Sequence, residues 1–293
     1  MDAETIPPGS AAVGVVGAGT MGQGIAYVFA MAGFPVCLVE PDAARADVAL
    51  AAIRASAAAG VARGKLTAAD AEARLAGLRL LPSVEALPVG LSLVVETVPE
   101  RADLKARVLA AIAGRGPAII ASNTSSMSID ALAAHVPDAA RFLGMHFFNP
   151  VPSLKLVELI RGAATTDDTL ARARGFAAAI GKTTVTVRDA PGFATSRLDL
   201  VQALEAIRMV EAGVATPEDI DRAVTTAYRH PVGPLRLSDM VGLDVRLDIA
   251  RQLESTLGPH FAPPRLLQEM VARGDLGAKS GRGFYDWPAP AAV

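Results

Sequence analysis

Two side chains of the types used in proton transfer lie twelve residues apart near the middle of the chain. His146 ends the apolar stretch that starts at Phe142, and Glu158 lies in the middle of the apolar stretch 156–160. A buried carboxylate needs a partner, because an unpaired charge is costly inside a protein. If two neighbouring strands bring these side chains together, the acid would orient the imidazole as a general base. The alternative is a buried pair that only ties two strands together.

A glycine-rich turn near the start of the chain has the spacing of a nucleotide-binding loop. Gly17, Gly19 and Gly22 form G-x-G-x-x-G between a predicted buried strand, 13–16, and a predicted helix, 21–32. The first glycine permits a tight turn, the second lets a pyrophosphate approach the backbone, and the third lets helix and strand pack closely. The N–H groups at the start of the helix would bind the phosphates. Glycines that only pack a helix on a strand are the alternative.

An acid follows the next predicted strand, residues 35–39, where a ribose would lie. Glu40 is 21 residues beyond Gly19 and would accept hydrogen bonds from both hydroxyls of the adenosine ribose. Because a carboxylate repels a 2′-phosphate, the pattern predicts NAD rather than NADP as the cofactor. Arg45 is either a base that could meet a 2′-phosphate or a solvated helix residue.

Strands and helices alternate along the first 188 residues, which predicts an α/β fold with a Rossmann-type, doubly wound and mainly parallel sheet. Residues 42–77 predict a helical hairpin inserted after the second strand. Further strands are predicted at 91–95, 118–121, 142–145, 155–160 and 183–187, with helices at 102–113, from 128, and at 167–180. The pattern after Pro191 is all-helical, with helices at 196–212, from 217, at 241–257 and at 264–273. We therefore expect two domains, 1–188 and a smaller one, 189–293.

Composition excludes several classes of protein. Of the 293 residues, 51% are hydrophobic, enough to bury a core and exclude general disorder. A net charge of −2 favours neither a nucleic-acid nor a membrane partner. The uncharged stretch 11–39 is interrupted by six glycines and Pro35, so it predicts buried elements rather than a membrane span. A single cysteine, Cys37, excludes a disulfide framework and a cysteine-based zinc site. The first ten residues carry two acids and no base, unlike the start of a signal peptide, which predicts a cytoplasmic protein.

Seven segments, in order, resemble one family. They are GAGTMGQGIA, VVETVPE, ASNTSSMSI, GMHFFNPVPSLKLVELIRG, IGKTTVTVRDAPGF, HPVGPL and KSGRGFYDW. Over about residues 11–287 the chain is similar to the 3-hydroxyacyl-CoA dehydrogenase family, including its bacterial members that act on 3-hydroxybutyryl-CoA. The resemblance implies an NAD-dependent homodimer of fatty-acid metabolism (β-oxidation) that oxidises (S)-3-hydroxyacyl-CoA to 3-oxoacyl-CoA. It also implies that the first domain binds NAD and that the helical domain serves substrate binding and dimerisation.

The resemblance assigns roles to individual residues. It makes His146 the catalytic base, Glu158 its orienting acid, and Ser125 a hydrogen-bond partner of substrate and cofactor. Asn149 would lie near the nicotinamide. The implied cofactor contacts are Gly17, Gly19, Thr20, Met21, Gly22, Glu40, Glu100, Lys105, Ser125, Asn149 and Lys279. With Ser125, the implied contacts of the CoA substrate are Ser56 and Arg63, with Lys65 as the alternative to Arg63.

The chain departs from the family pattern at two positions. Ser196 stands where the family has an asparagine thought to bind the substrate oxygen, and its shorter hydroxyl would act through a water or a closer substrate. Glu40 replaces the usual aspartate and keeps its charge. Two alternatives remain open: a dehydrogenase of the L-gulonate type, acting on a free sugar acid, and a non-catalytic NAD-binding structural relative.

Overall fold

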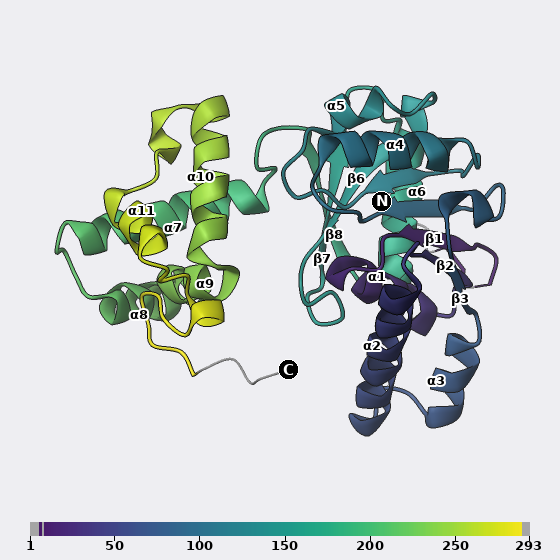
Figure 1. Cartoon of the computed structure of the whole chain (residues 1–293), viewed down its shortest axis with the longest axis horizontal. Coiled ribbons are helices and arrows are strands. Elements are labelled where there is room, and N and C mark those ends of the chain that lie inside the picture. Colours follow the sequence, from purple (N-terminus) through teal and green to yellow (C-terminus); the bar gives the residue numbers. More distant parts are fainter. Residues whose placement is uncertain (1–5, 8, 289–293) are drawn as a thin grey trace. The chain divides into compact units, whose positions relative to one another are not determined.

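A computed structural model describes residues 6–7 and 9–288 of the chain (Figure 1). The chain divides into two compact units, Met1–Ala190 and Pro191–Val293. The first combines strands and helices, and the second is built from helices. The predicted Rossmann-type fold with a smaller helical part after it is therefore confirmed.

Among the described residues, the first unit contains a sheet of eight strands in the order β3-β2-β1-β4-β5-β6-β7-β8. The strands are β1 (Val13–Val16), β2 (Val36–Val39), β3 (Leu78–Leu81), β4 (Leu93–Glu96), β5 (Ile120–Ser122), β6 (Phe142–Phe147), β7 (Leu156–Arg161) and β8 (Thr183–Arg188). Neighbouring strands pair in parallel, except that β6 and β7 are antiparallel. Every residue of β1, β2 and β4 is buried, as expected for strands covered on both faces.

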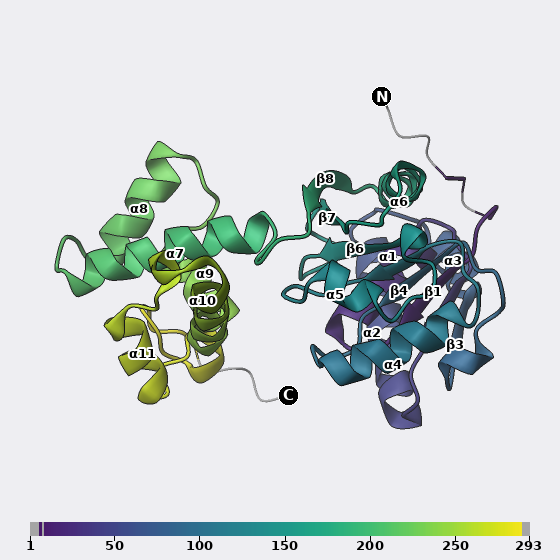
Figure 2. The ribbon, with the colours of Figure 1, turned by 90° about the horizontal axis from the view of Figure 1, so that it is seen from above.

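Helices cover both faces of this sheet (Figure 2). They are α1 (Thr20–Met31), α2 (Ala43–Ala62), α3 (Ala68–Leu75), α4 (Ala102–Ala113), α5 (Ile129–Ala133) and α6 (Asp167–Ala179). Helices α1 and α6 share one core, in which the rings of Phe29 and Phe176 lie 6.3 Å apart. Helices α4 and α5 pack on β4, β5 and β6 from the opposite face. Helices α2 and α3 form the predicted hairpin.

The uncharged stretch 11–39 folds as β1, α1 and β2. The apolar side chains of these elements contribute to a hydrophobic core of the first unit. In the part of the chain that the structure describes, no helix is both long enough and apolar enough to cross a membrane. Cys37 lies buried in β2 as a free thiol, and burial raises its pKa.

The sequence pattern did not predict β3. This four-residue strand is only partly buried, carries the exposed Arg79, and lies at the edge of the sheet. Its partner is β2, which it pairs with over its whole length. The strand therefore forms because β2 has a free edge to pair with. Its own short sequence, LRLL, is not enough to predict a strand.

The second unit packs its helices around an aliphatic core that includes Leu204, Leu247 and Leu267. The helices are α7 (Thr195–Glu211), α8 (Pro217–Ala227), α9 (Pro234–Val241), α10 (Leu243–Leu257) and α11 (Arg265–Ala272). The sequence pattern did not predict α9. Like α8, it has a proline in its first turn, where the missing N–H costs no hydrogen bond.

Two buried aspartates tie the C-terminal segment to this unit. Asp221 accepts hydrogen bonds from the N–H of Leu235 and from the hydroxyl of Tyr285, at 2.9 and 2.8 Å. Burial and the carboxylate of Asp221 together raise the pKa of Tyr285. Asp239 accepts from the N–H of Tyr285 and from the indole of Trp287, both at 2.9 Å. These bonds explain how the HPVGPL and GFYDW segments come to lie together.

Candidate active site and cofactor site

The glycine turn after β1 is tightly closed on one side. Gly17 has a φ of +103°, a conformation that favours glycine, and a Cβ at Gly22 would lie 1.8 Å from the carbonyl oxygen of Gly17. The hydroxyl of Thr97, just after β4, donates to that same oxygen at 2.8 Å. These contacts fix the turn against the sheet.

The other side of the turn is open. At Gly19 a Cβ would meet no atom within 4 Å beyond its chain neighbours. Helix α1 starts at the next residue, Thr20, and its first turn, which includes Met21, contains no acidic residue and no capping side chain. A helix N-terminus of this kind suits a phosphate, because its N–H groups and dipole attract negative charge.

Glu40 lies beside this turn at the end of β2. The carboxylate is 7% exposed, and its Oε2 accepts the N–H of Ala18 at 3.3 Å. Its Oε1 accepts the N–H of Asp42 at 3.2 Å and Nη2 of Arg45 at 2.8 Å. A closed turn, an open glycine and a fixed acid next to them fit the phosphates and the adenosine ribose of NAD.

Strands β6 and β7 bring His146 and Glu158 face to face. The two residues are direct partners in the antiparallel register, and Nδ1 of His146 lies 2.8 Å from Oε2 of Glu158. Glu158 is fully buried, His146 is nearly so, and the ring of Phe148 packs 4.4 Å from the imidazole. A carboxylate at Nδ1 favours the tautomer with its proton on Nδ1, which leaves the lone pair on Nε2. This is the arrangement of an acid-oriented general base.

The segment 148–155, which links β6 to β7, packs against α1. A Cβ at Gly24 of α1 would come within 2.8 Å of Cβ of Val151, so a glycine is needed for this contact. Lys182 donates to the carbonyl oxygens of Val151 and Leu154, the second at 2.6 Å, and burial lowers its pKa. The helix that follows the glycine turn and the segment that follows His146 are thus in contact.

One edge of the sheet collects most of the predicted residues. Because β1, β4, β5 and β6 are mutually parallel, their carboxyl ends lie at the same edge. Gly17 follows β1, Ser125 follows β5 and Asn149 follows β6, and the last two are exposed. Open α/β sheets bind their ligands outside this edge.

Glu100, Lys105 and Ser125 belong to one hydrogen-bonded network. The side chain of Lys105 is 1% exposed, and its Nζ lies 2.7 Å from Oε1 of Glu96 and 3.4 Å from Oε2 of Glu100. Glu100 in turn accepts the N–H of Ser125 at 2.7 Å and its hydroxyl at 3.2 Å. The amine of Lys105 therefore forms ion pairs with two acids of the protein. Its contact with the cofactor stays a prediction.

Four polar residues of this edge were not predicted as site residues. The hydroxyl of Ser122 donates to the buried Glu96 at 2.6 Å, and that of Thr124 donates to Glu100 at 2.9 Å. Oδ1 of Asn123 accepts the N–H of Phe147 at 2.8 Å and so links β5 to the residue after His146. The signal that could have revealed Glu96 is an acid at the end of an apolar strand, the same signal that pointed to Glu40.

The residues assigned to CoA lie on or just after α2. The hydroxyl of Ser56 donates to the carbonyl oxygen of Ala52 at 2.9 Å, and Nε of Arg63 donates to that of Ala59 at 3.0 Å. Arg63 and its alternative Lys65 are both exposed. The role of the three residues in binding CoA stays a prediction.

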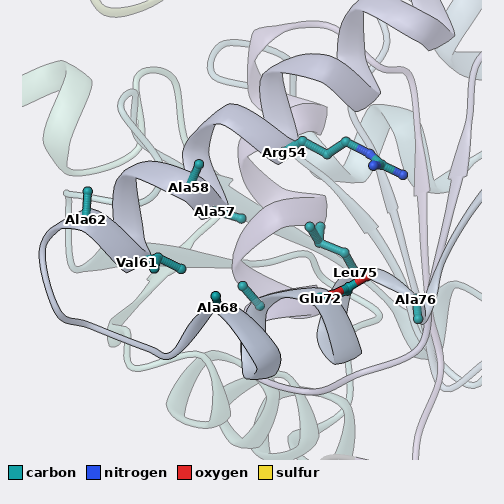
Figure 3. A pocket seen from close by; sticks show the side chains of 10 residues that line it. Arg54, Ala57, Ala58, Val61, Ala62, Ala68, Glu72, Leu75 and Ala76 are labelled. Atoms are coloured by element: carbon teal, nitrogen blue, oxygen red, sulfur yellow. The ribbon is translucent and has the colours of Figure 1, made fainter.

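A hollow of about 670 Å³ lies between α2 and α3 (Figure 3). Its walls are mostly small and apolar, with one base and one acid: Arg54, Ala57, Ala58, Val61, Ala62, Ala68, Ala71, Glu72, Leu75 and Ala76. Neither Ser56 nor Arg63 lines it, so these predicted CoA contacts lie on a different face of α2.

Two predicted residues belong to the second unit. Ser196 lies in the first turn of α7 and is partly buried. Lys279 forms an ion pair with Asp244, with Nζ 2.6 Å from Oδ2. Their roles toward the substrate oxygen and the cofactor stay predictions.

Family comparison agrees with this geometry. Residues 12–190 match the model of the 3-hydroxyacyl-CoA dehydrogenase NAD binding domain, and residues 192–287 match the C-terminal domain of the same family. The chain belongs to the 3-hydroxyacyl-CoA dehydrogenase family. The resemblance predicted from sequence and the predicted NAD cofactor are both confirmed.

Individual relatives are similar over nearly their whole length. The chain is 44% identical to a 3-hydroxybutyryl-CoA dehydrogenase of Mycobacterium tuberculosis, over 94% of this chain and 98% of the relative. It is 40% identical to that of Bradyrhizobium diazoefficiens, over 94% of each. Among solved structures, (S)-3-hydroxybutyryl-CoA dehydrogenase PaaH1 from Ralstonia eutropha has a TM-score of 0.90 at 42% identity, covering 94% of this chain and 99% of that one.

Proposed function

We propose that the protein is an NAD-dependent dehydrogenase that interconverts (S)-3-hydroxyacyl-CoA and 3-oxoacyl-CoA. The family to which it belongs and the names of its relatives support this substrate class. The observation that carries the proposal is the 2.8 Å contact between His146 and Glu158 at the ligand-binding edge of the sheet. A sugar-acid substrate gains no support from the relatives named above.

In the oxidative direction Nε2 of His146 accepts the proton of the 3-hydroxyl group. NAD, when bound by the glycine turn and Glu40, supplies the hydride acceptor. Glu158 keeps the imidazole in one tautomer and stabilises the imidazolium that forms, because its charge lies 2.8 Å away in a buried site. In the reductive direction His146 returns the proton to the 3-oxo oxygen.

In this proposal Ser125 forms hydrogen bonds with the substrate and the cofactor, and Asn149 lies near the nicotinamide. Ser196 takes the place of the family asparagine that binds the substrate oxygen. Glu100 fixes the backbone and the hydroxyl of Ser125 by the two hydrogen bonds described above. Because Glu100 is itself held near Lys105, the hydroxyl of Ser125 is oriented before a ligand arrives.

The test is an assay of the purified protein with NADH and acetoacetyl-CoA, beside dehydrogulonate as the sugar-acid substrate. We expect NADH to be consumed with the thioester only. Turnover of the sugar acid alone would contradict the acyl-CoA assignment, and NADH binding without turnover of any acyl-CoA would support the non-catalytic alternative. A panel of 3-hydroxyacyl-CoA thioesters then shows which acyl chain lengths the enzyme accepts. That range tests whether its substrates are those of fatty-acid β-oxidation.

The proposal includes a cytoplasmic homodimer formed through the helical unit. Several large apolar side chains of that unit are exposed: Leu198, Val201, Val214, Tyr228, Met240, Val241 and Val245. Exposed apolar patches often mark protein interfaces, and we propose that these side chains contribute to the dimer contact. Sedimentation equilibrium of the full chain tests this proposal, and a monomer at micromolar concentration would contradict it.

A further inference from the structure

The acid assigned to the adenosine ribose has a base lying over it. Arg45 belongs to the first turn of α2, where Asp42 accepts its N–H at 3.0 Å. From this position its side chain turns back toward β2, and Nη2 lies 2.8 Å from Oε1 of Glu40. Nε lies 3.8 Å from Oδ2 of Asp42, so the guanidinium is close to two carboxylates.

The two members of this pair differ strongly in exposure. Glu40 is 7% exposed and is fixed by the N–H groups of Ala18 and Asp42, whereas the side chain of Arg45 is 70% exposed. An arginine carries five N–H donors in a planar fork, and most of those of Arg45 face solvent. When the guanidinium turns toward a ligand, the buried carboxylate of Glu40 keeps the two backbone N–H groups as partners, so Arg45 can move without leaving that carboxylate unpaired.

We infer that Arg45 is a second determinant of nucleotide specificity and lets the site bind NADP(H) as well as NAD(H). The ribose hydroxyls of NAD(H) are accepted by Glu40, as in the proposed function on which this inference rests. The 2′-phosphate of NADP(H) is bound by the guanidinium of Arg45, which suits a phosphate because of its paired N–H donors. Without Arg45 the phosphate would meet the carboxylates of Glu40 and Asp42, and like charges would disfavour its binding.

The inference is tested by binding, without an acyl-CoA substrate. NADH and NADPH are titrated separately into the purified protein, and nucleotide fluorescence gives each Kd. We expect wild-type protein to bind both nucleotides. Arg45→Ala should raise the Kd for NADPH by about 10- to 100-fold, since it removes charge-assisted hydrogen bonds. The Kd for NADH should change by less than about threefold. Arg54→Ala is the matched control, because Arg54 is an exposed arginine on the same helix.

Two outcomes would overturn the inference. One is wild-type protein that binds NADH but shows no measurable NADPH binding. The other is an Arg45→Ala variant whose affinities for the two nucleotides are unchanged or fall by the same factor. These outcomes are independent of the reaction: a failure to reduce acetoacetyl-CoA with normal nucleotide binding contradicts the proposed function and leaves the role of Arg45 standing.

Discussion

Replacing Glu158 by glutamine tests the catalytic pair most directly, because the amide has the shape of the carboxylate but not its charge. Over the 2.8 Å between Nδ1 and Oε2, the attraction between imidazolium and carboxylate is about 6 kcal/mol at an effective dielectric constant of about 20. A hydrogen bond from Nδ1–H to the amide oxygen retains about 1 kcal/mol of this interaction. The charge exists mainly in the transition state, so we expect the barrier to rise by about 3–5 kcal/mol and kcat to fall roughly 10²- to 10⁴-fold.

The assay measures NADH consumption with acetoacetyl-CoA for Glu158→Gln, for His146→Gln and for the double variant. Because the two side chains act as one unit, the double variant should be about as slow as the slower single variant rather than slower by the product of both effects. Titration with NADH serves as the control, since neither side chain is part of the glycine turn. Its Kd should change by less than about threefold in all three variants.

Near-normal turnover of Glu158→Gln, within about threefold of wild type, would refute the role of its charge. A variant that unfolds more easily while its folded fraction turns over normally would instead favour the alternative of a pair that only ties β6 to β7. Multiplicative losses in the double variant would show that the two residues act separately.

Three further substitutions follow from the structure. Gly19→Ala should leave the melting temperature unchanged, because its Cβ meets no atom within 4 Å, yet weaken NADH binding at least about tenfold by blocking the approach of the pyrophosphate. Gly22→Ala should lower stability as well as affinity, since its Cβ would lie 1.8 Å from the carbonyl oxygen of Gly17, and equal melting curves for the two variants would contradict this. Lys105→Met should lower the free energy of unfolding in urea by about 3–5 kcal/mol, because it leaves the buried charge of Glu96 without a counter-charge. Adding Glu96→Gln should recover much of the loss, and additive losses would show that the two residues are not coupled.

The first half of the cofactor site could be predicted because its signal is local. Gly22 must be glycine because of its contact with Gly17, five residues before it, and the buried strand before the turn is a continuous apolar run. The edge strand β3 could not be predicted in this way. Its partly exposed residues form a strand because β2 offers a free edge, and that edge is a property of the assembled sheet.

The antiparallel arrangement of the strands that carry His146 and Glu158 follows from the length of the link between them. The eight residues 148–155 are too few for the crossover that parallel strands need, so β6 and β7 must be antiparallel. In an antiparallel pair the partners lie at equal distances from the middle of the link. The middle of the link 148–155 lies between residues 151 and 152, so this rule places position 146 opposite 157, one residue short of the observed partner Glu158. The network around Lys105 has no such rule, because it gathers side chains from separate elements.

Three buried carboxylates of the first unit are each matched by a different kind of base. The pairs are Glu40 with Arg45, Glu96 with Lys105, and Glu158 with His146. The exposure of the base, 70%, 1% and 8% of its side chain in that order, determines what each pair can do. Arg45 can exchange its acid for a phosphate, whereas the buried Lys105 holds Glu96 and Glu100 in place. His146 is the base that accepts and returns the substrate proton in the proposed reaction, so its acid stabilises a charge that appears during that reaction.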